Sequence, residues 1–373
     1  MKILHIITSL RMGGAERLVA DMLPRLRSRG HRVELLLFDG TRTPLFEQLE
    51  RQGIAIHTLG RGVLQMWNPL HLFRLKKYLR NRRYDIVHTH NTPCQLLTAM
   101  AAPKAAPLLV TTEHNTTNRR RNWAWFDKIE RMMYGKYRHI ACVSRRTKEN
   151  LERKLGAAFD AADISVVENG IDLSRFLTAR ADMALRTPDE RDKKIVVMVA
   201  AFRPQKDQPT LIRAMRHLPD DYRLWLVGEG PEQSACRRLA EKAALTDRVR
   251  FLGVRSDVPE LLAASDVVVL SSHYEGMSLA SIEGMASGKP FIASDVDGLC
   301  DTVADAAPLF PHEDSRQLAG LVRQLCEDLT LYESVASRCR EKALGFDIET
   351  VVDKYEKVYK RYNTAYLCKI ILN

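Results

Sequence analysis

Residues 266–290 read DVVVLSSHYEGMSLASIEGMASGKP and form the most informative stretch of the chain. An apolar run of strand length, residues 266–270, leads into a polar loop and then into a segment with the helical spacing of apolar residues. Glu275 lies in the loop and Glu283 about two turns into the helix. The stretch therefore predicts a buried strand, a loop that carries a carboxylate, and a helix, which is one unit of a parallel α/β sheet.

The same alternation of short apolar runs and amphipathic stretches extends along the whole chain. The runs are ILHIITSL, VELLLF, DIVHTH, LLVTTEHN and HIACVS in the first half, and KIVVMVAAF, YRLWLVGEG, VRFLGV, DVVVLSS and KPFIASD in the second. The polar segment 178–194 between them contains no strand pattern. We therefore expect two Rossmann-like parallel-sheet domains, residues 1–180 and 181–346, facing an interdomain cleft, with a C-terminal helix at 347–373 that packs back toward the first domain.

Charge divides the chain unevenly. Residues 1–180 carry 31 lysines and arginines against 16 aspartates and glutamates, whereas residues 181–373 carry 26 against 30. A basic half suits nucleic acid, an anionic membrane or a phosphorylated ligand. No groove-reading or zinc motif accompanies the charge, so we expect no nucleic-acid partner. The seven cysteines form no C-x-x-C pair, which fits a reducing compartment.

Two loops combine features that favour phosphate. Gly13 and Gly14 follow the first apolar run, where glycine lets the backbone approach a ligand at a helix start. Their spacing does not fit the dinucleotide motif G-x-G-x-x-G, and a tight turn without a ligand is the alternative. Arg203 and Lys206 follow the first strand of the second domain, and such a cation pair can hold a diphosphate. A solvated basic loop is the alternative there.

The two glutamates offer a different chemistry. Carboxylates accept hydrogen bonds from sugar hydroxyls, and both Glu275 and Glu283 can point toward the end of the sheet. Gly276 leaves the first amides of the following helix open to phosphate. Either glutamate alone is most often a solvated side chain, so the prediction of a site depends on the pair.

With these motifs in order, the chain resembles the family 4 retaining glycosyltransferases of GT-B fold, whose signature is two glutamates separated by seven residues. The resemblance covers nearly the whole chain. It is carried by Gly13-Gly14, Asp85 to His90, His114, Val143-Ser144, Asn169 to Asp172, Arg203 to Lys206, Gly228 to Pro231, and Glu275 with Glu283.

The resemblance implies a role for each matching residue. Arg203 and Lys206 are expected on the donor diphosphate, Glu283 on the ribose hydroxyls and Glu275 on the donor sugar. His114 is expected near the transferred sugar, so that the implied catalytic set is His114, Glu275, Arg203 and Lys206. The further donor-binding positions are Gly13, Gly14, Asn169, Gly228, Gly276, Met277 and Ser278. A lone histidine at a strand end is, outside this resemblance, more often structural.

Two positions depart from the family pattern. Glu168 stands where the family usually has proline, and Asp297 lies near a position often held by glycine. Asp295 and Asp297 also form a D-x-D triplet, which holds a divalent metal in a different glycosyltransferase fold. Arg203 and Lys206 already supply positive charge for the diphosphate, so we expect no metal and no other cofactor.

The expected reaction is transfer of a sugar from a nucleotide diphosphate sugar, UDP-sugar favoured, to a hydroxyl of a glycan or lipid-linked acceptor. The resemblance implies retention by front-face attack, with surface polysaccharide synthesis as the setting. The alternatives are a sugar-nucleotide 2-epimerase of the same architecture and a non-catalytic glycan-binding or scaffold subunit. The intact quartet Arg203, Lys206, Glu275 and Glu283 favours the transferase.

We expect a cytoplasmic location, peripheral at the inner face of the cell membrane. No apolar run approaches the roughly 18 residues that a span requires. The cations are concentrated in residues 74–83 and in the segment 119–126, which reads RRRNWAWF. Cations beside aromatic rings suit the headgroup region of an anionic membrane. A solvated basic face is the alternative.

Overall fold

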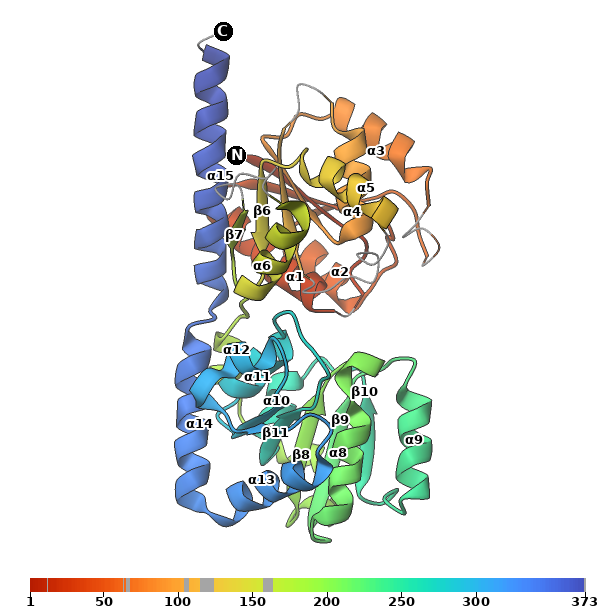
Figure 1. Cartoon of the computed structure of the whole chain (residues 1–373), viewed down its shortest axis with the longest axis vertical. Helices are drawn as coiled ribbons and strands as arrows, with labels where there is room; N and C mark the ends of the chain where they lie inside the picture. Colours follow the sequence, from red (N-terminus) through yellow and green to blue (C-terminus); the bar gives the residue numbers. More distant parts are fainter. Residues whose placement is uncertain are drawn as a thin grey trace. The chain divides into compact units, whose positions relative to one another are not determined.

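The computed structural model describes residues 1–11, 13–62, 64, 68–103, 107–114, 124–156 and 164–371, with backbone alone for residues 124–127 and 363–371. Its contacts form two units, Met1–Gly170 with Ile348–Asn373, and Ile171–Asp347. The division falls earlier in the chain than residue 180, because Ile171 donates a backbone hydrogen bond to Phe346 and pairs with Asp347. Each unit is an α/β domain built on one parallel sheet (Figure 1).

The first unit contains a seven-stranded sheet of order β3-β2-β1-β4-β5-β6-β7, in which all neighbours are parallel. Its strands are β1 (Lys2–Ile7), β2 (Arg32–Leu37), β3 (Ala55–Thr58), β4 (Ile86–His90), β5 (Leu108–Glu113), β6 (His139–Cys142) and β7 (Ile164–Val166). The central strands β1 and β4 are buried on both faces, as their continuous apolar runs predict.

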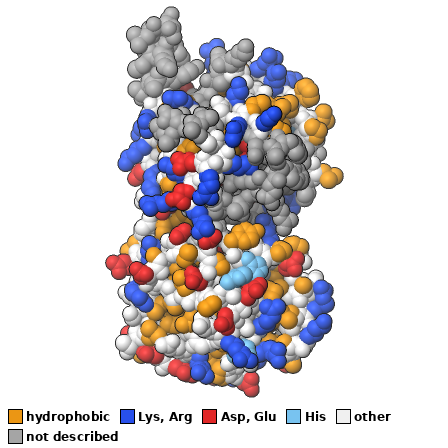
Figure 2. Space-filling view, in the orientation of Figure 1, with side chains coloured by type: hydrophobic (Ala, Val, Ile, Leu, Met, Phe, Trp, Pro, Cys, Tyr) orange, Lys and Arg blue, Asp and Glu red, His pale blue; other side chains and the backbone are white. Residues whose placement is uncertain are grey.

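Helices cover both faces of this sheet. They are α1 (Gly14–Ser28), α2 (Pro44–Arg51), α3 (His71–Arg80), α4 (Thr92–Ala101), α5 (Ala124–Tyr134), α6 (Arg145–Leu155) and α15 (Ile348–Ile371). One apolar core joins the sheet to α1, α2 and α15, and a second core on the opposite face joins it to α3, α4, α5 and α6. Many lysine and arginine side chains of this unit are exposed, as the net charge of its sequence requires (Figure 2).

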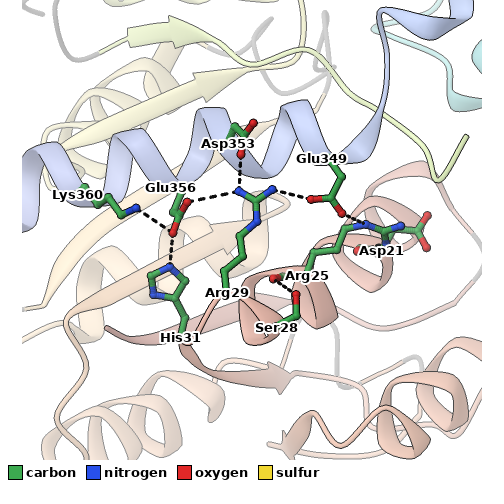
Figure 3. Close-up of polar contacts among 9 residues, drawn as sticks. All are labelled: Asp21, Arg25, Ser28, Arg29, His31, Glu349, Asp353, Glu356 and Lys360. Carbon is green, nitrogen blue, oxygen red and sulfur yellow. Dashed lines mark hydrogen bonds and ion pairs between the residues drawn. The ribbon is translucent and has the colours of Figure 1, made fainter.

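Helix α15 is the last element of the chain but belongs to the first unit. Tyr355 and Tyr359 on its inner face are fully buried in the core shared with α1. At the rim, Arg29, which directly follows α1, contacts three carboxylates of α15, and Arg25 of α1 shares one of them, Glu349 (Figure 3). Apolar burial and a line of ion pairs thus attach α15 to this sheet.

The second unit contains a six-stranded parallel sheet of order β10-β9-β8-β11-β12-β13. Its strands are β8 (Lys194–Val199), β9 (Tyr222–Val227), β10 (Val249–Gly253), β11 (Val267–Leu270), β12 (Phe291–Ser294) and β13 (Leu309–Phe310). Its helices are α7 (Ser174–Leu177), α8 (Gln208–Ala214), α9 (Gln233–Lys242), α10 (Val258–Ala263), α11 (Leu279–Ala286), α12 (Leu299–Val303), α13 (Ser315–Glu327) and α14 (Leu329–Leu344), with short 3-10 turns η5 (Met183–Leu185), η6 (Pro188–Glu190), η7 (Pro204–Lys206), η8 (Met215–His217) and η9 (Ala304–Ala306).

Both sheets reverse their strand order once, between β1 and β4 in the first unit and between β8 and β11 in the second. In doubly wound sheets, ligands bind outside the carboxyl ends of the strands at such a switch point. Among the helices that the structure describes, none has both the length and the apolar character to cross a bilayer.

Candidate functional site

The switch point of the second unit gathers most of the residues expected to bind a donor. The loop after β8 carries Arg203 and Lys206, and the loop after β11 carries Glu275 and leads into α11. Since β8 and β11 are adjacent parallel strands, both loops leave the same edge of the sheet.

Lys206 and Glu275 are in direct contact. The Lys206 Nζ lies 2.5 Å from Glu275 Oε1, and both side chains are largely buried. Ser272 Oγ donates to the same carboxylate oxygen at 2.6 Å, and Gln205 Nε2 donates to the other oxygen at 3.3 Å. Three donors therefore hold the carboxylate in one orientation, and its negative charge lies beside a cation.

The backbone of the Glu275 loop is fixed by the loop that follows β12. The Glu275 amide donates to the carbonyl of Asp297 at 3.0 Å, and Ser294 Oγ donates to the carbonyl of Ser272 at 2.6 Å. Gly298 has φ +81°, and a Cβ at this position would lie 2.1 Å from the Glu275 carbonyl oxygen. Only glycine allows so close an approach, so Gly298 sets the position of the Glu275 backbone.

Gly276, Met277 and Ser278 connect Glu275 to α11. Ser278 is the N-cap residue of α11 with an extended backbone, and its side chain caps none of the first amides. The amides at this helix start are therefore directed toward the same edge of the sheet as Lys206, an arrangement that favours an anion. Glu283 lies within α11 and is partly exposed, in the middle of a helix whose other face is buried.

Arg203 and Gly228 lie at the same edge. The Arg203 side chain is exposed and, within the described part of the chain, makes no ion pair. Gly228 directly follows β9 with φ +130°, and a Cβ there would lie 2.2 Å from the carbonyl oxygen of Ala200 after β8. The glycine thus permits close packing of the loops after β8 and β9.

In the first unit, Gly13 and Gly14 begin α1. Gly13 is the N-cap residue with an extended backbone, and it makes no side-chain cap hydrogen bond to the first amides of α1. A Cβ at Gly13 would meet only the flexible end of the Glu16 side chain. Asn169 lies close to the end of this unit's main segment and is buried.

His114 directly follows β5, and its ring is the last in a row of three contacting histidine rings. His114 Nε2 lies 3.1 Å from His90 Nδ1, and His90 Nε2 lies 3.2 Å from His5 Nδ1. The neighbouring His88 contacts Tyr359 of α15 at 2.6 Å. Burial lowers the pKa of His5 to about 3 and that of His114 to about 4, and lowers the pKa of His88 and His90 well below the ordinary value. All four are therefore neutral near pH 7.

Part of the expected basic surface is described and part is not. The cations of residues 74–83 lie on and after α3, and most are exposed. Residues 119–123 and the side chains of residues 124–126 lie outside the described residues.

Two groups of described side chains have the spacing of metal ligands. His5, His88 and His90 form one, but both nitrogens of His88 already bond to Tyr359 and to Thr112. The other combines Asp207, His273, His312 and Glu313 in the second unit. Asp295 and Asp297 are exposed and belong to neither group.

Sequence reasoning missed several of these neighbours. Gln205 and Ser272 both donate to Glu275. Their polar side chains close to Lys206 and Glu275 in the sequence were the only local sign of this role. His312 contacts His273 although the two are 39 positions apart, and no local pattern relates them.

Comparisons with known proteins match both halves of the chain to glycosyltransferase families. The model for "Glycosyltransferase Family 4" matches residues 12–175, and that for "Glycosyl transferases group 1" matches residues 185–343. An Escherichia coli enzyme named UDP-Gal:alpha-D-GlcNAc-diphosphoundecaprenol alpha-1,3-galactosyltransferase is 28% identical over 96% of each chain. A phosphatidyl-myo-inositol mannosyltransferase of Mycolicibacterium smegmatis is 25% identical over 95% of this chain and 91% of the relative.

Solved structures share the fold. Anabaena HepE in complex with UDP and glucose superposes with a TM-score of 0.84 at 23% identity, covering 97% of this chain and 100% of the other. A sucrose-phosphate synthase of Thermosynechococcus elongatus has a TM-score of 0.82 at 22% identity, covering 98% and 99%. The family matches, the full-length relatives and the shared architecture show that the chain belongs to the family 4 glycosyltransferases of GT-B fold.

Proposed function

We propose that this glycosyltransferase moves a sugar from a UDP-sugar to a hydroxyl of a lipid-linked glycan, with retention at the anomeric carbon, in surface polysaccharide synthesis. The observation that carries the proposal is the Lys206–Glu275 pair at the switch point of the second sheet. UDP is favoured because the Escherichia coli relative is named for a UDP-sugar, and HepE was solved with UDP. The same relative's name specifies a diphosphoundecaprenol-linked acceptor.

The donor is proposed to bind with its diphosphate between Arg203 and Lys206. The exposed guanidinium can fork onto phosphate oxygens, and the ammonium adds a point charge. Both offset the negative charge that grows on the diphosphate as the glycosidic bond breaks. The amides of Gly276, Met277 and Ser278 add neutral donors, and Glu283 accepts from the ribose hydroxyls.

Glu275 is proposed to bind the donor sugar rather than to attack it. Its carboxylate already accepts from Lys206, Ser272 and Gln205, and such bonds lower its power as a nucleophile. Retention then follows from front-face attack, in which the departing diphosphate takes the acceptor proton. His114 is proposed beside the transferred sugar, where a neutral imidazole can donate or accept one hydrogen bond. Asn169, Gly13 and Gly14 are proposed as further donor contacts.

The experiment that tests the activity incubates purified enzyme with a panel of nucleotide sugars and undecaprenyl-diphosphate-linked acceptors. NMR of the product then gives the anomeric configuration. An α-linked product from an α-linked donor supports retention, whereas a β-linked product contradicts it. An epimerised donor sugar without transfer would establish the 2-epimerase, and absence of any turnover with the whole panel would favour a glycan-binding subunit.

We further propose that the transfer step uses no metal ion on the diphosphate, because Arg203 and Lys206 supply the positive charge. After EDTA treatment, adding Mg²⁺ or Mn²⁺ in excess is expected to leave the transfer rate unchanged. Restoration of a lost rate by Mg²⁺, which prefers oxygen ligands alone, would contradict this.

A cytoplasmic location at the inner membrane face is proposed from the surface of α3. Its exposed side chains include Phe73, with Leu70 just before the helix, among cations at Arg74, Lys76 and Lys77. Figure 2 shows apolar and basic side chains mixed on this unit. Apolar groups can enter the headgroup boundary while each cation near an anionic surface adds about 1 kcal/mol.

Sedimentation with vesicles tests this docking. Wild-type protein is expected to bind vesicles containing phosphatidylglycerol at low salt and to be released by high salt. Phe73→Ser with Lys77→Ser should bind less, whereas Lys193→Ser in the second unit should bind as wild type. Equal binding to neutral and anionic vesicles, or none to either, would overturn the proposal.

A further inference from the structure

Four side chains from three separate loops meet at the carboxyl edge of the second sheet. Asp207 follows η7 after β8, His273 follows β11, and His312 with Glu313 follows β13. One nitrogen or oxygen atom from each lies within 4.8 Å of the others. Figure 2 shows histidine side chains at the surface of this unit, with acidic side chains beside them.

Asp207 contributes a buried carboxylate oxygen that has no hydrogen-bond donor among the described residues. The residue is 5% exposed, and its Oδ2 accepts no hydrogen bond from any described residue. Its other oxygen, Oδ1, accepts from the Thr210 amide and so caps α8. A buried carboxylate oxygen without a donor is costly, and a bound cation is one way to satisfy it.

The separations within the group fit a small coordination sphere. His273 Nδ1 lies 2.5 Å from His312 Nε2, 3.9 Å from Asp207 Oδ2 and 4.0 Å from Glu313 Oε1. In a tetrahedral site with bond lengths of 2.0–2.1 Å, neighbouring ligand atoms lie roughly 3.3 Å apart. This separation falls between the shortest and the longest of the three distances. Rotations of the partly exposed His273 and the exposed Glu313 can make up the difference.

The loops are held so that the four groups stay together. The His273 amide donates to the carbonyl of Gln205 at 2.8 Å, which joins the loops after β8 and β11. Asp314, next to Glu313, caps α13 through the amides of Arg316 and Gln317. Asp207 and Glu313 both have positive φ, at +46° and +63°.

We propose that Asp207, His273, His312 and Glu313 form a binding site for a divalent transition-metal ion of the Zn²⁺ type. Two imidazoles with two carboxylates suit Zn²⁺ and its neighbours, whereas Mg²⁺ and Ca²⁺ prefer oxygen ligands alone. The bound ion cross-links the loops after β8, β11 and β13. Two of these loops also carry Lys206 and Glu275, so the ion stabilises the backbone around the donor-binding pair without touching the diphosphate.

Metal binding is measured on EDTA-treated, dialysed full-length protein that carries no histidine tag. Calorimetric titration with Zn²⁺ is expected to give one ion per chain, and Mg²⁺ to give no binding. At Zn²⁺ concentrations about 100-fold above Kd, the melting temperature of the second unit should rise by roughly 5–10 °C. Neither readout needs a donor or an acceptor, so failure here is separate from failure of the proposed transferase activity.

Variants then locate the ion. His273→Ala with His312→Ala should weaken Zn²⁺ binding at least about 100-fold. Asp207→Asn, which retains the capping geometry but removes the charge, should also weaken it. His217→Ala, an exposed histidine of the same unit, should bind as wild type. No Zn²⁺ binding by wild type, or unchanged binding by the double histidine variant, would overturn the site.

Discussion

At the scale of single residues, glycines determine how closely the loops around Glu275 approach one another. Gly298 and Gly288 both have φ near +80°, but only Gly298 has a neighbour, the Glu275 carbonyl, where a Cβ would lie. Alanine at either position introduces backbone strain, but only alanine at position 298 also displaces the Glu275 loop.

We expect Gly298→Ala to lower kcat/KM with the identified donor at least about tenfold, because the Glu275 backbone must move. Gly288→Ala should cost only the strain of its conformation, about 1–2 kcal/mol of stability, and leave kcat/KM near wild type. Donor kinetics and thermal unfolding of both variants check this. Equal kinetic losses in the two variants would show that Gly298 has no special part in positioning Glu275.

Sequence reasoning could name Glu275, Glu283, Arg203 and Lys206 because a local motif marks each of them. It could not find the partners of Glu275, since Gln205 and Ser272 have side chains that are equally common in solvated loops. It also could not predict that His114 contacts His90 and that His90 contacts His5, because the alignment of β1, β4 and β5 in the sheet brings these side chains together.

At the scale of elements, the attachment of α15 combines two kinds of interaction of unequal strength. Arg29 pairs with Glu349, Asp353 and Glu356, but Glu349 and Asp353 are more than half exposed. Exposed pairs contribute roughly 0.2–1 kcal/mol each. Tyr359, by contrast, is fully buried against the sheet, and its hydroxyl contacts His88.

Tyr359→Ala is therefore expected to destabilise the first unit by about 3–5 kcal/mol, through the cavity and the lost hydrogen bond. Arg29→Ala should cost no more than about 2 kcal/mol, and less in high salt. Urea unfolding followed by hydrogen exchange in β1 and β4 reports on this unit. A larger loss from Arg29→Ala than from Tyr359→Ala would mean that the ion pairs, not the buried tyrosines, hold α15.

Ten of the strands could be predicted because buried parallel strands read as short apolar runs, whereas the edge strands β3, β7 and β13 are short and match none of the predicted runs. The return of the chain to the first unit was predicted at residue 347 and occurs at residue 348, whereas the first boundary was predicted at residue 180 and lies at residue 170. The pairing of Ile171 with Asp347, far apart in sequence, has no local signal.

At the scale of the whole molecule, the buried histidines make the first unit sensitive to acid. Burial lowers the pKa of His5 to about 3 and those of His114 and His139 to about 4, and it lowers the pKa of His88 and His90 well below the ordinary value. Between about pH 6.5 and pH 4 the unfolded chain therefore binds more protons than the folded one. The stability is complete above pH 6.5 and is lost as the pH falls through this range.

We expect the unfolding free energy of the first unit to fall by roughly 1.4 kcal/mol per pH unit for each such histidine. Hydrogen exchange at pH 7.5 and pH 5 should show β1 and β4 losing protection before β8 and β11. His5→Asn, which cannot gain a proton, should reduce the slope. A first unit as stable at pH 5 as at pH 7.5 would show that these histidines are not buried in the neutral form.

The central claim is that the switch point of the second unit binds the donor through Lys206 and Glu283. Its most direct test is the steady-state transfer rate of wild type, Lys206→Ala, Glu283→Ala and Lys193→Ala with the identified donor. Each lost charged hydrogen bond is worth about 1.5–3 kcal/mol, so the first two variants should lose about 10- to 150-fold in kcat/KM. Lys193, a partly exposed lysine just before β8 at the opposite end of the strand, serves as the control and should retain the wild-type value. Near wild-type kcat/KM in folded Lys206→Ala and Glu283→Ala would contradict the account.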